Sequence, residues 1–207
     1  MYEAFYGLKE KPFSIQPDPE FLFFSLRHSM AYAMLEYGVQ NRAGFSVICG
    51  EIGCGKTTLV RHLLNNLGDE LTVGIVYNTH EHIDDLLGWI MLSFGQPYEG
   101  KSNLALYDAF QQFFQRVSVD FFIPPLESFE ADKYIHHRLH IAGRDAPLFT
   151  AAATRLIGEA SRGIPRSINI LCDTALVYGY STNADKIDVG LVREVIKDRA
   201  EFGVLGI

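Results

Sequence analysis

The pattern of apolar and polar positions predicts alternating strands and helices in the first 126 residues. Short apolar or β-branched runs bounded by turn residues predict strands at 45–49, 72–77 and 117–123. Apolar positions at helical spacing predict helices at 28–39, 56–67, 84–94 and 104–114. Strands that alternate with helices favour a parallel sheet, so this part of the chain is expected to be an α/β domain.

From residue 127 onward the pattern is helical. Apolar spacing, with an N-cap candidate or a proline at each start, predicts helices at 128–142, 150–162, 165–180 and 188–200. We therefore expect an arm and α/β domain over residues 1–126 and an all-α domain over residues 127–207. In the arm, the first forty residues, aromatic residues that require burial stand between prolines that break regular structure.

Composition narrows the class of protein. With 207 residues and 48% apolar residues, the chain can bury a core. It contains neither a run approaching 18 apolar residues nor an apolar stretch typical of a signal peptide, so we expect a cytoplasmic protein without its own membrane span. The three cysteines lack metal-ligand spacing and are expected to be reduced thiols. The net charge of −7 disfavours nucleic-acid binding over the whole surface but leaves a local basic patch open.

The strongest chemical signal is a glycine-rich loop between the predicted strand 45–49 and the next helix. It has the spacing Gly-x-x-x-x-Gly-Lys-Thr, in which glycines let backbone N–H groups fold around an anion. Lys56 can reach the β and γ phosphates, and the Thr57 hydroxyl can bind Mg²⁺. We predict binding of ATP and Mg²⁺ by Gly50, Glu51, Ile52, Gly53, Cys54, Gly55, Lys56, Thr57 and Thr58.

Two of these loop residues are expected to contribute backbone amides rather than side chains. They are Glu51 and Cys54. A redox role for the Cys54 thiol is the alternative, because a helix N-terminus lowers the pKa of a thiol.

Several further segments carry a family resemblance. They are Phe5-Tyr6-Gly7-Leu8, Pro12-Phe13, Pro17-Asp18-Pro19, His28, Tyr134-Ile135-x-x-Arg138-Leu139, Phe149-Thr150 and Gly163-Ile164-Pro165-Arg166-x-Ile168-Asn169-x-Leu171-Cys172-Asp173. With the phosphate loop, they resemble AAA+ ATPases of the general secretion pathway protein A group; similar proteins serve in mannose-sensitive haemagglutinin pilus biogenesis and beside exosortase systems. The resemblance implies a P-loop NTPase parallel sheet followed by an all-α lid domain. It also implies ATP hydrolysis coupled to assembly of a secretion or pilus system, with peripheral attachment to the inner membrane through a partner protein.

The resemblance also implies roles for individual side chains. Arg166 matches the sensor 2 arginine that touches the γ phosphate, and Arg116 matches a position that acts in trans as an arginine finger, which implies a homo-oligomer. The alternatives are a solvated arginine capping a turn at Arg166 and a surface arginine favoured by a helix dipole at Arg116. By analogy His28 lies near the adenine, although we favour a partly buried histidine of the arm.

One family feature is missing from the sequence. An ATPase of this type has a strand ending in Asp-Glu, which holds Mg²⁺ and activates the attacking water, and no such pair follows the loop. The run Val117–Asp120 imitates it, but Phe121 stands where the glutamate is needed. We therefore expect an internally truncated sheet. The sequence leaves three functions open: a secretion-type ATPase, a catalytically inactive nucleotide-binding interaction module, and a DNA-associated transposition-type ATPase.

Overall fold

Contacts between residues divide the chain into two compact units. The computed structural model describes residues 1–41, 45–67, 76, 86–113 and 118–202. One unit comprises Met1–Tyr32, Ile48–His62 and Phe121–Ile207, and the other comprises Ala33–Val47 and Leu63–Asp120.

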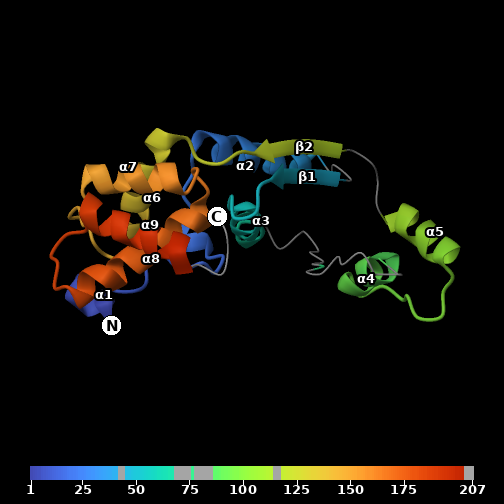
Figure 1. The fold of residues 1–207 in the computed structure, drawn as a ribbon. Coiled ribbons are helices and arrows are strands. Elements are labelled where there is room, and N and C mark those ends of the chain that lie inside the picture. The colour runs from blue at the N-terminus through green and yellow to red at the C-terminus, as the bar shows by residue number, and fades with distance from the viewer. Residues whose placement is uncertain (42–44, 68–75, 77–85, 114–117, 203–207) are drawn as a thin grey trace. The chain divides into compact units, whose positions relative to one another are not determined.

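The first part of the chain contains the predicted mixture of helices and strands (Figure 1). Its elements are α1 (Tyr2–Phe5), the 3-10 helix η1 (Pro19–Phe21), α2 (Leu26–Gln40), β1 (Phe45–Gly50), α3 (Lys56–Asn65), α4 (Leu86–Ser93), α5 (Asn103–Phe113) and β2 (Ser118–Ile123). The strands β1 and β2 are parallel neighbours in a small sheet, which confirms the predicted strands at both positions. The strand predicted at 72–77 lies, apart from Val76, outside the described residues.

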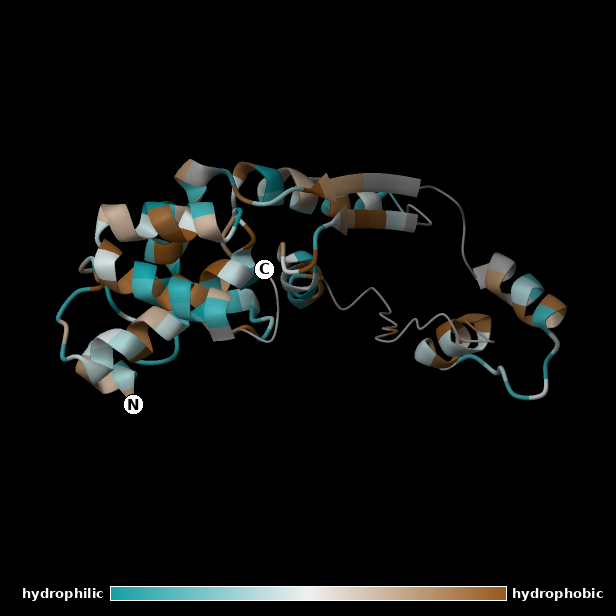
Figure 2. Cartoon of the chain, in the orientation of Figure 1, coloured by the Kyte–Doolittle hydropathy of each residue, from teal (hydrophilic) through white to brown (hydrophobic). Residues whose placement is uncertain are grey.

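The four helices predicted in the last part of the chain are confirmed. They are α6 (Ser128–Ile141), α7 (Ala151–Ala160), α8 (Pro165–Ser181) and α9 (Val189–Phe202). The Thr150 hydroxyl accepts from the Ala153 N–H at the start of α7, and Pro165 opens α8, where a missing N–H costs nothing. Figure 2 shows apolar and polar residues alternating along these ribbons, as expected for helices with one buried face.

The aromatic arm packs into the same core as these C-terminal helices. Its buried apolar residues are Tyr2, Tyr6, Leu8, Phe13 and Phe21. Backbone contacts hold it as well, since the Lys9 N–H donates to the Ala142 carbonyl at 2.8 Å. The prolines interrupt the arm without preventing the short helices α1 and η1. The arm is therefore ordered, as predicted, while the domain boundary at residue 126 stays a prediction.

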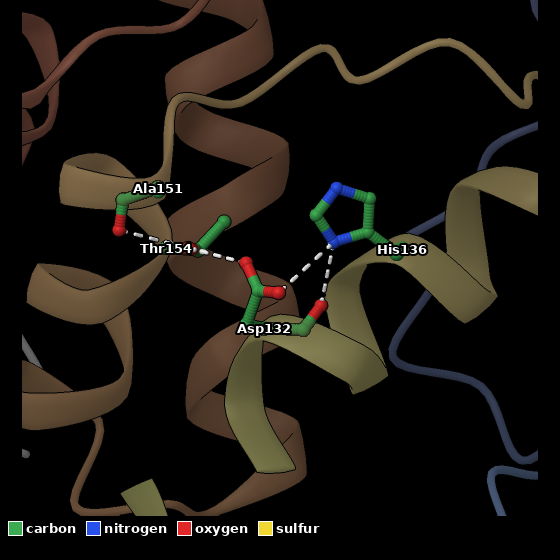
Figure 3. A network of polar contacts seen from close by, with 4 residues as sticks. All are labelled: Asp132, His136, Ala151 and Thr154. Carbon is green, nitrogen blue, oxygen red and sulfur yellow. Dashed lines mark hydrogen bonds and ion pairs between the residues drawn. The ribbon is translucent and has the colours of Figure 1, made fainter. Parts of the chain in front are cut away.

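A polar network joins α6 to α7 (Figure 3). The hydroxyl of Thr154, which is 1% exposed, donates to the Asp132 carboxylate at 2.7 Å and also lies 3.1 Å from the Ala151 carbonyl. The Nδ1 atom of His136 lies 2.8 Å from the Asp132 carbonyl oxygen and 3.5 Å from its carboxylate. The Thr154 hydroxyl contacts oxygen atoms of both helices, and the His136 ring does not reach this hydroxyl. The network therefore links α6 to α7 and does not pair a nucleophile with a base.

Removing the buried Thr154 hydroxyl should weaken the interaction between α6 and α7. We expect Thr154→Val to lower the free energy of unfolding by about 1–2 kcal/mol, because the Asp132 carboxylate loses a donor. Urea denaturation followed by circular dichroism measures the change. The control is Thr182→Val at the exposed end of α8, for which we expect a change below about 0.5 kcal/mol. Equal changes in the two variants would contradict the prediction.

Candidate nucleotide-binding site

The phosphate loop leaves β1 at Gly50 and enters α3 at Lys56. Its three glycines, Gly50, Gly53 and Gly55, all have positive φ, as predicted for a loop whose N–H groups turn inward. The Lys56 ammonium folds back over the loop and donates to the carbonyls of Gly50 and Glu51, each at 2.8 Å. These two hydrogen bonds hold the Lys56 ammonium over the loop. A bound anion would compete with the two carbonyl oxygens for hydrogen bonds from the ammonium.

The loop presents backbone donors that have no acceptor within the described part of the chain. They are the N–H groups of Gly53, Gly55, Lys56, Thr57 and Thr58. The first N–H groups of a helix have no partner in the helix itself, and the helix dipole adds partial positive charge there. Several such donors around one loop form a site for an anion such as a phosphate.

A cavity of about 290 Å³ lies beside the loop, within the unit that contains Met1–Tyr32, Ile48–His62 and Phe121–Ile207. The predicted loop residues that line it are Ile52, Gly53, Gly55, Lys56, Thr57 and Thr58. Gly50, Glu51 and Cys54 do not line it. The lining includes the cations Lys56, Arg138 and Arg166, and Asp18 is the one carboxylate among the described lining residues. In a chain with a net charge of −7, this cationic lining favours an anionic ligand.

The start of α8 lies directly against the phosphate loop. The Arg166 N–H donates to the Gly53 carbonyl at 3.3 Å, and a Cβ atom added to Gly53 would lie 2.6 Å from the Arg166 Cβ. The Arg166 guanidinium is exposed and has no hydrogen-bond or ion-pair partner among the described residues. The structure thus brings together Lys56 and Arg166, which are far apart in the sequence. The sensor role of Arg166 stays a prediction.

A second close approach holds the turn before α8. A Cβ atom at Gly163 would lie 2.0 Å from the Leu126 carbonyl oxygen, and the φ of +71° is one that other residues rarely adopt. The Leu126 N–H donates to the Gly163 carbonyl at 2.8 Å. Glycine at this position therefore lets α8 begin close to the segment that follows β2.

Residues that the sequence did not assign to the site also line the cavity. The arm loop, Ser14 to Asp18, lines the cavity together with Tyr134, Arg138 and Asn169. Arg138 is 5% exposed and donates to the Pro12 carbonyl through Nε and to the Ser14 carbonyl through Nη2 at 3.2 Å. Its guanidinium carbon lies 4.3 Å from the centre of the Phe21 ring, and burial lowers its pKa.

One signal in the sequence could have found Arg138. It lies on an apolar helix face with no acidic residue three or four positions away, which is unusual for an arginine that pairs along its own helix. Asn169, on α8, donates to the same Ser14 carbonyl at 3.1 Å and accepts from the Tyr134 hydroxyl at 2.8 Å. The arm loop is therefore held by side chains of α6 and α8.

The loop cysteine is buried rather than reactive. Cys54 is 0% exposed, and burial raises the pKa of its thiol, so the thiol stays protonated near neutral pH. This environment disfavours the alternative redox role. His28, expected to be partly buried, is 3% exposed and lines the cavity, with its ring against the carbonyl of Cys54.

Arg116, the candidate arginine finger, lies outside the described residues, so its action in trans stays a prediction. The run Val117–Asp120, which imitates the missing Asp-Glu strand, is described only in part. Residues 118–120 of the run Val117–Asp120 belong to β2, but their side chains are not described. Within the described ranges, no group of three or more histidine, cysteine or acidic residues could hold a metal ion. The binding of Mg²⁺ by the Thr57 hydroxyl stays a prediction.

Comparison with known proteins agrees with the loop chemistry. Residues 39–124, which include the whole phosphate loop, match the family model described as an AAA domain. This segment of the chain is similar to an AAA domain. The chain is also a distant homologue of general secretion pathway protein A of Aeromonas hydrophila, with 30% identity over 253 residues. That alignment covers 90% of this chain and 46% of the relative, so the chain spans about half of the relative's length.

The length of the alignment bears on the missing Asp-Glu strand. Since 90% of 207 residues is about 186, an aligned span of 253 residues leaves about 67 positions of the relative without a counterpart in this chain. The chain is therefore shorter than the relative within the aligned span, and the internally truncated sheet stays a prediction. In addition, no helix within the described residues is long and apolar enough to cross a membrane.

Proposed function

We propose that this chain binds ATP with Mg²⁺ in the cavity beside the phosphate loop. The observation that carries the proposal is the concentration of positive charge and free donors around one cavity. The backbone N–H groups of Gly53 and Gly55 and those of residues 56–58 lack acceptors in the described part of the chain, and Lys56 and Arg166 line the same space. Phosphate oxygens provide both the negative charge and the acceptors that these groups need.

Three side chains would act on the triphosphate and its metal ion. Lys56 would exchange its two carbonyl acceptors for phosphate oxygens, and the Thr57 hydroxyl would bind the metal ion that shields the phosphates. Arg166, at the start of α8, would contact the terminal phosphate and so make the position of α8 depend on the nucleotide. These roles require a nucleotide with a terminal phosphate.

Binding is better supported than hydrolysis. Hydrolysis needs a carboxylate that activates water beside the terminal phosphate. The one acidic residue among the described lining residues is Asp18, and its carboxylate accepts from the Glu20 N–H at 3.0 Å at the start of η1. We therefore propose a nucleotide-dependent binding module.

The homologue suggests the biological setting. Its name refers to a general secretion pathway, and we extend that role to this chain as part of the proposal. A secretion or pilus protein at the inner membrane would then be the partner that senses the bound nucleotide. Homo-oligomerisation is a further part of this proposal, because Arg116 could reach a neighbouring nucleotide only in an assembly.

Calorimetry and a phosphate-release assay test the proposal together. With Mg²⁺ present, we expect the purified chain to bind ATP with a Kd in the micromolar range, as is common for small-molecule sites. Steady-state phosphate release should not exceed that of Lys56→Ala. Absence of ATP binding would reject the site itself. Turnover above the Lys56→Ala background would instead show that the chain is an ATPase and reject the binding-only function.

A further inference from the structure

The side chain of His28, within the arm, is buried against the phosphate loop. His28 lies in the first turn of α2 and is 3% exposed. Its Nε2 atom is 2.9 Å from the Cys54 carbonyl oxygen, and its Nδ1 atom is 2.7 Å from the hydroxyl of Ser25, which is also 3% exposed. The His28 backbone N–H donates to the same hydroxyl oxygen at 3.3 Å. Both ring nitrogens are therefore used, and the ring has one orientation.

The chemistry of these partners fixes the direction of each hydrogen bond. A carbonyl oxygen can only accept, so Nε2 carries the proton and donates to Cys54. Burial lowers the pKa of His28, which favours the neutral ring near neutral pH. In the neutral ring Nδ1 has no proton, so it accepts the hydrogen of the Ser25 hydroxyl. Ser25 thereby holds the ring in place while the ring holds the loop.

Holding the Cys54 carbonyl also sets the direction of the next N–H group. The peptide unit between Cys54 and Gly55 is planar and trans, so its C=O and N–H point in opposite directions. With the carbonyl directed at His28, the Gly55 N–H is directed away from the histidine. Within the described residues this N–H has no acceptor, and Gly55 lines the cavity.

We infer that His28 is a positioning residue for the phosphate loop, which holds the Cys54 carbonyl so that the Gly55 N–H faces the bound triphosphate. The inference rests on the proposed function, because it needs an anion in the loop. Without the donor at Nε2, the flexible peptide between Cys54 and Gly55 can rotate, and the loop loses one oriented donor. The contact is close, since a Cβ atom at Gly55 would lie 3.2 Å from the His28 Nε2.

Calorimetry with inorganic tripolyphosphate isolates the contribution of the loop, because this probe has neither base nor ribose. For His28→Leu we expect affinity to fall by about 10-fold, the value of one hydrogen bond to a charged group. For His28→Gln, whose side-chain amide can donate to the Cys54 carbonyl, we expect a loss below about threefold. The control His140→Leu, at an exposed histidine of α6, should bind as the unaltered chain does.

An NMR signal tests the same inference independently of overall stability. The chain contains two Cys-Gly pairs, Cys49-Gly50 and Cys54-Gly55, so ¹³C-carbonyl cysteine with ¹⁵N-glycine labels two peptide groups, and Cys49→Ser removes one of them. We expect the Gly55 amide proton to move downfield on addition of tripolyphosphate, because it then donates to an oxyanion. The shift should persist in His28→Gln and in His140→Leu. If His28→Leu does not fold, His28→Gln and the unaltered chain still provide this readout.

The possible outcomes separate the two proposals. If the unaltered chain binds no tripolyphosphate and no ATP, the proposed function fails and the inference fails with it. If the chain binds tripolyphosphate but the Gly55 signal does not move, or if His28→Gln binds as weakly as His28→Leu, the inference alone is wrong. If His28 acts only on the stability of the fold, tripolyphosphate affinity should follow thermal stability in all variants. The His28→Gln variant would then not bind tripolyphosphate more tightly than its stability predicts.

Discussion

Replacing Lys56 by alanine should reduce ATP affinity by at least about 100-fold, since the ammonium supplies charge-assisted hydrogen bonds worth about 1.5–3 kcal/mol each. Its two present acceptors, the carbonyls of Gly50 and Glu51, are backbone groups that can turn to water when the lysine is removed. The fold should therefore survive, and the loss should be specific to the ligand. Calorimetry with ATP and Mg²⁺ measures the affinity.

The matched control for this variant is Lys186→Ala. Lys186 is exposed between α8 and α9 and does not line the cavity, so its replacement removes the same charge without touching the loop. We expect unchanged ATP affinity in this variant. Similar losses in both variants would mean that Lys56 acts only through the net charge, and unchanged affinity in Lys56→Ala would place the nucleotide elsewhere.

Replacing Arg138 by methionine should destabilise the chain by about 2–4 kcal/mol, because the carbonyl of the buried Pro12 loses its donor and the contact with Phe21 is removed. Methionine retains most of the length and apolar volume of the arginine stem, so the change isolates the guanidinium. The Pro12 carbonyl loses the donor from Nε, whereas the Ser14 carbonyl keeps the Asn169 amide at 3.1 Å. The contact with the face of Phe21 is also lost.

Urea denaturation of Arg138→Met and of Arg155→Met compares a buried arginine with an exposed one. Arg155 lies on α7 with its side chain exposed, and we expect its replacement to change the free energy of unfolding by less than about 0.5 kcal/mol. A change of that small size for Arg138→Met would show that the arm loop is held by other contacts. Because Arg138 also lines the cavity, ATP affinity should fall in the same variant.

Local sequence signals predicted the helices and the phosphate loop well for a physical reason. Pro165 and Thr150 act within one or two turns of their own position, and the glycines of the loop act on their own φ angles. Such effects are present in the sequence itself. The prediction ran about two residues past the end of α3 at Asn65, where the end of a helix depends on weaker preferences.

The sequence was less informative about contacts between distant segments. Prolines and aromatic residues indicated an ordered arm, but they could not indicate that Tyr2 and Phe13 pack among the C-terminal helices. Nothing close to Arg138 in the sequence identifies Pro12 and Ser14 as its acceptors, because more than 120 positions separate them. The wall of the cavity formed by the arm loop was therefore not predicted.

The sequence alone predicted the groups that this chain can offer a triphosphate. Gly50 to Thr57 contain the glycines, the lysine and the hydroxyl at the required spacing, because those groups act over a few neighbouring residues. The tertiary structure decided what surrounds that loop. In this structure Arg166 packs against Gly53, the Arg138 guanidinium donates to the Ser14 carbonyl of the arm loop, and the His28 ring donates to the Cys54 carbonyl. These contacts come from the packing of buried side chains, which fixes neighbours that no local spacing can specify.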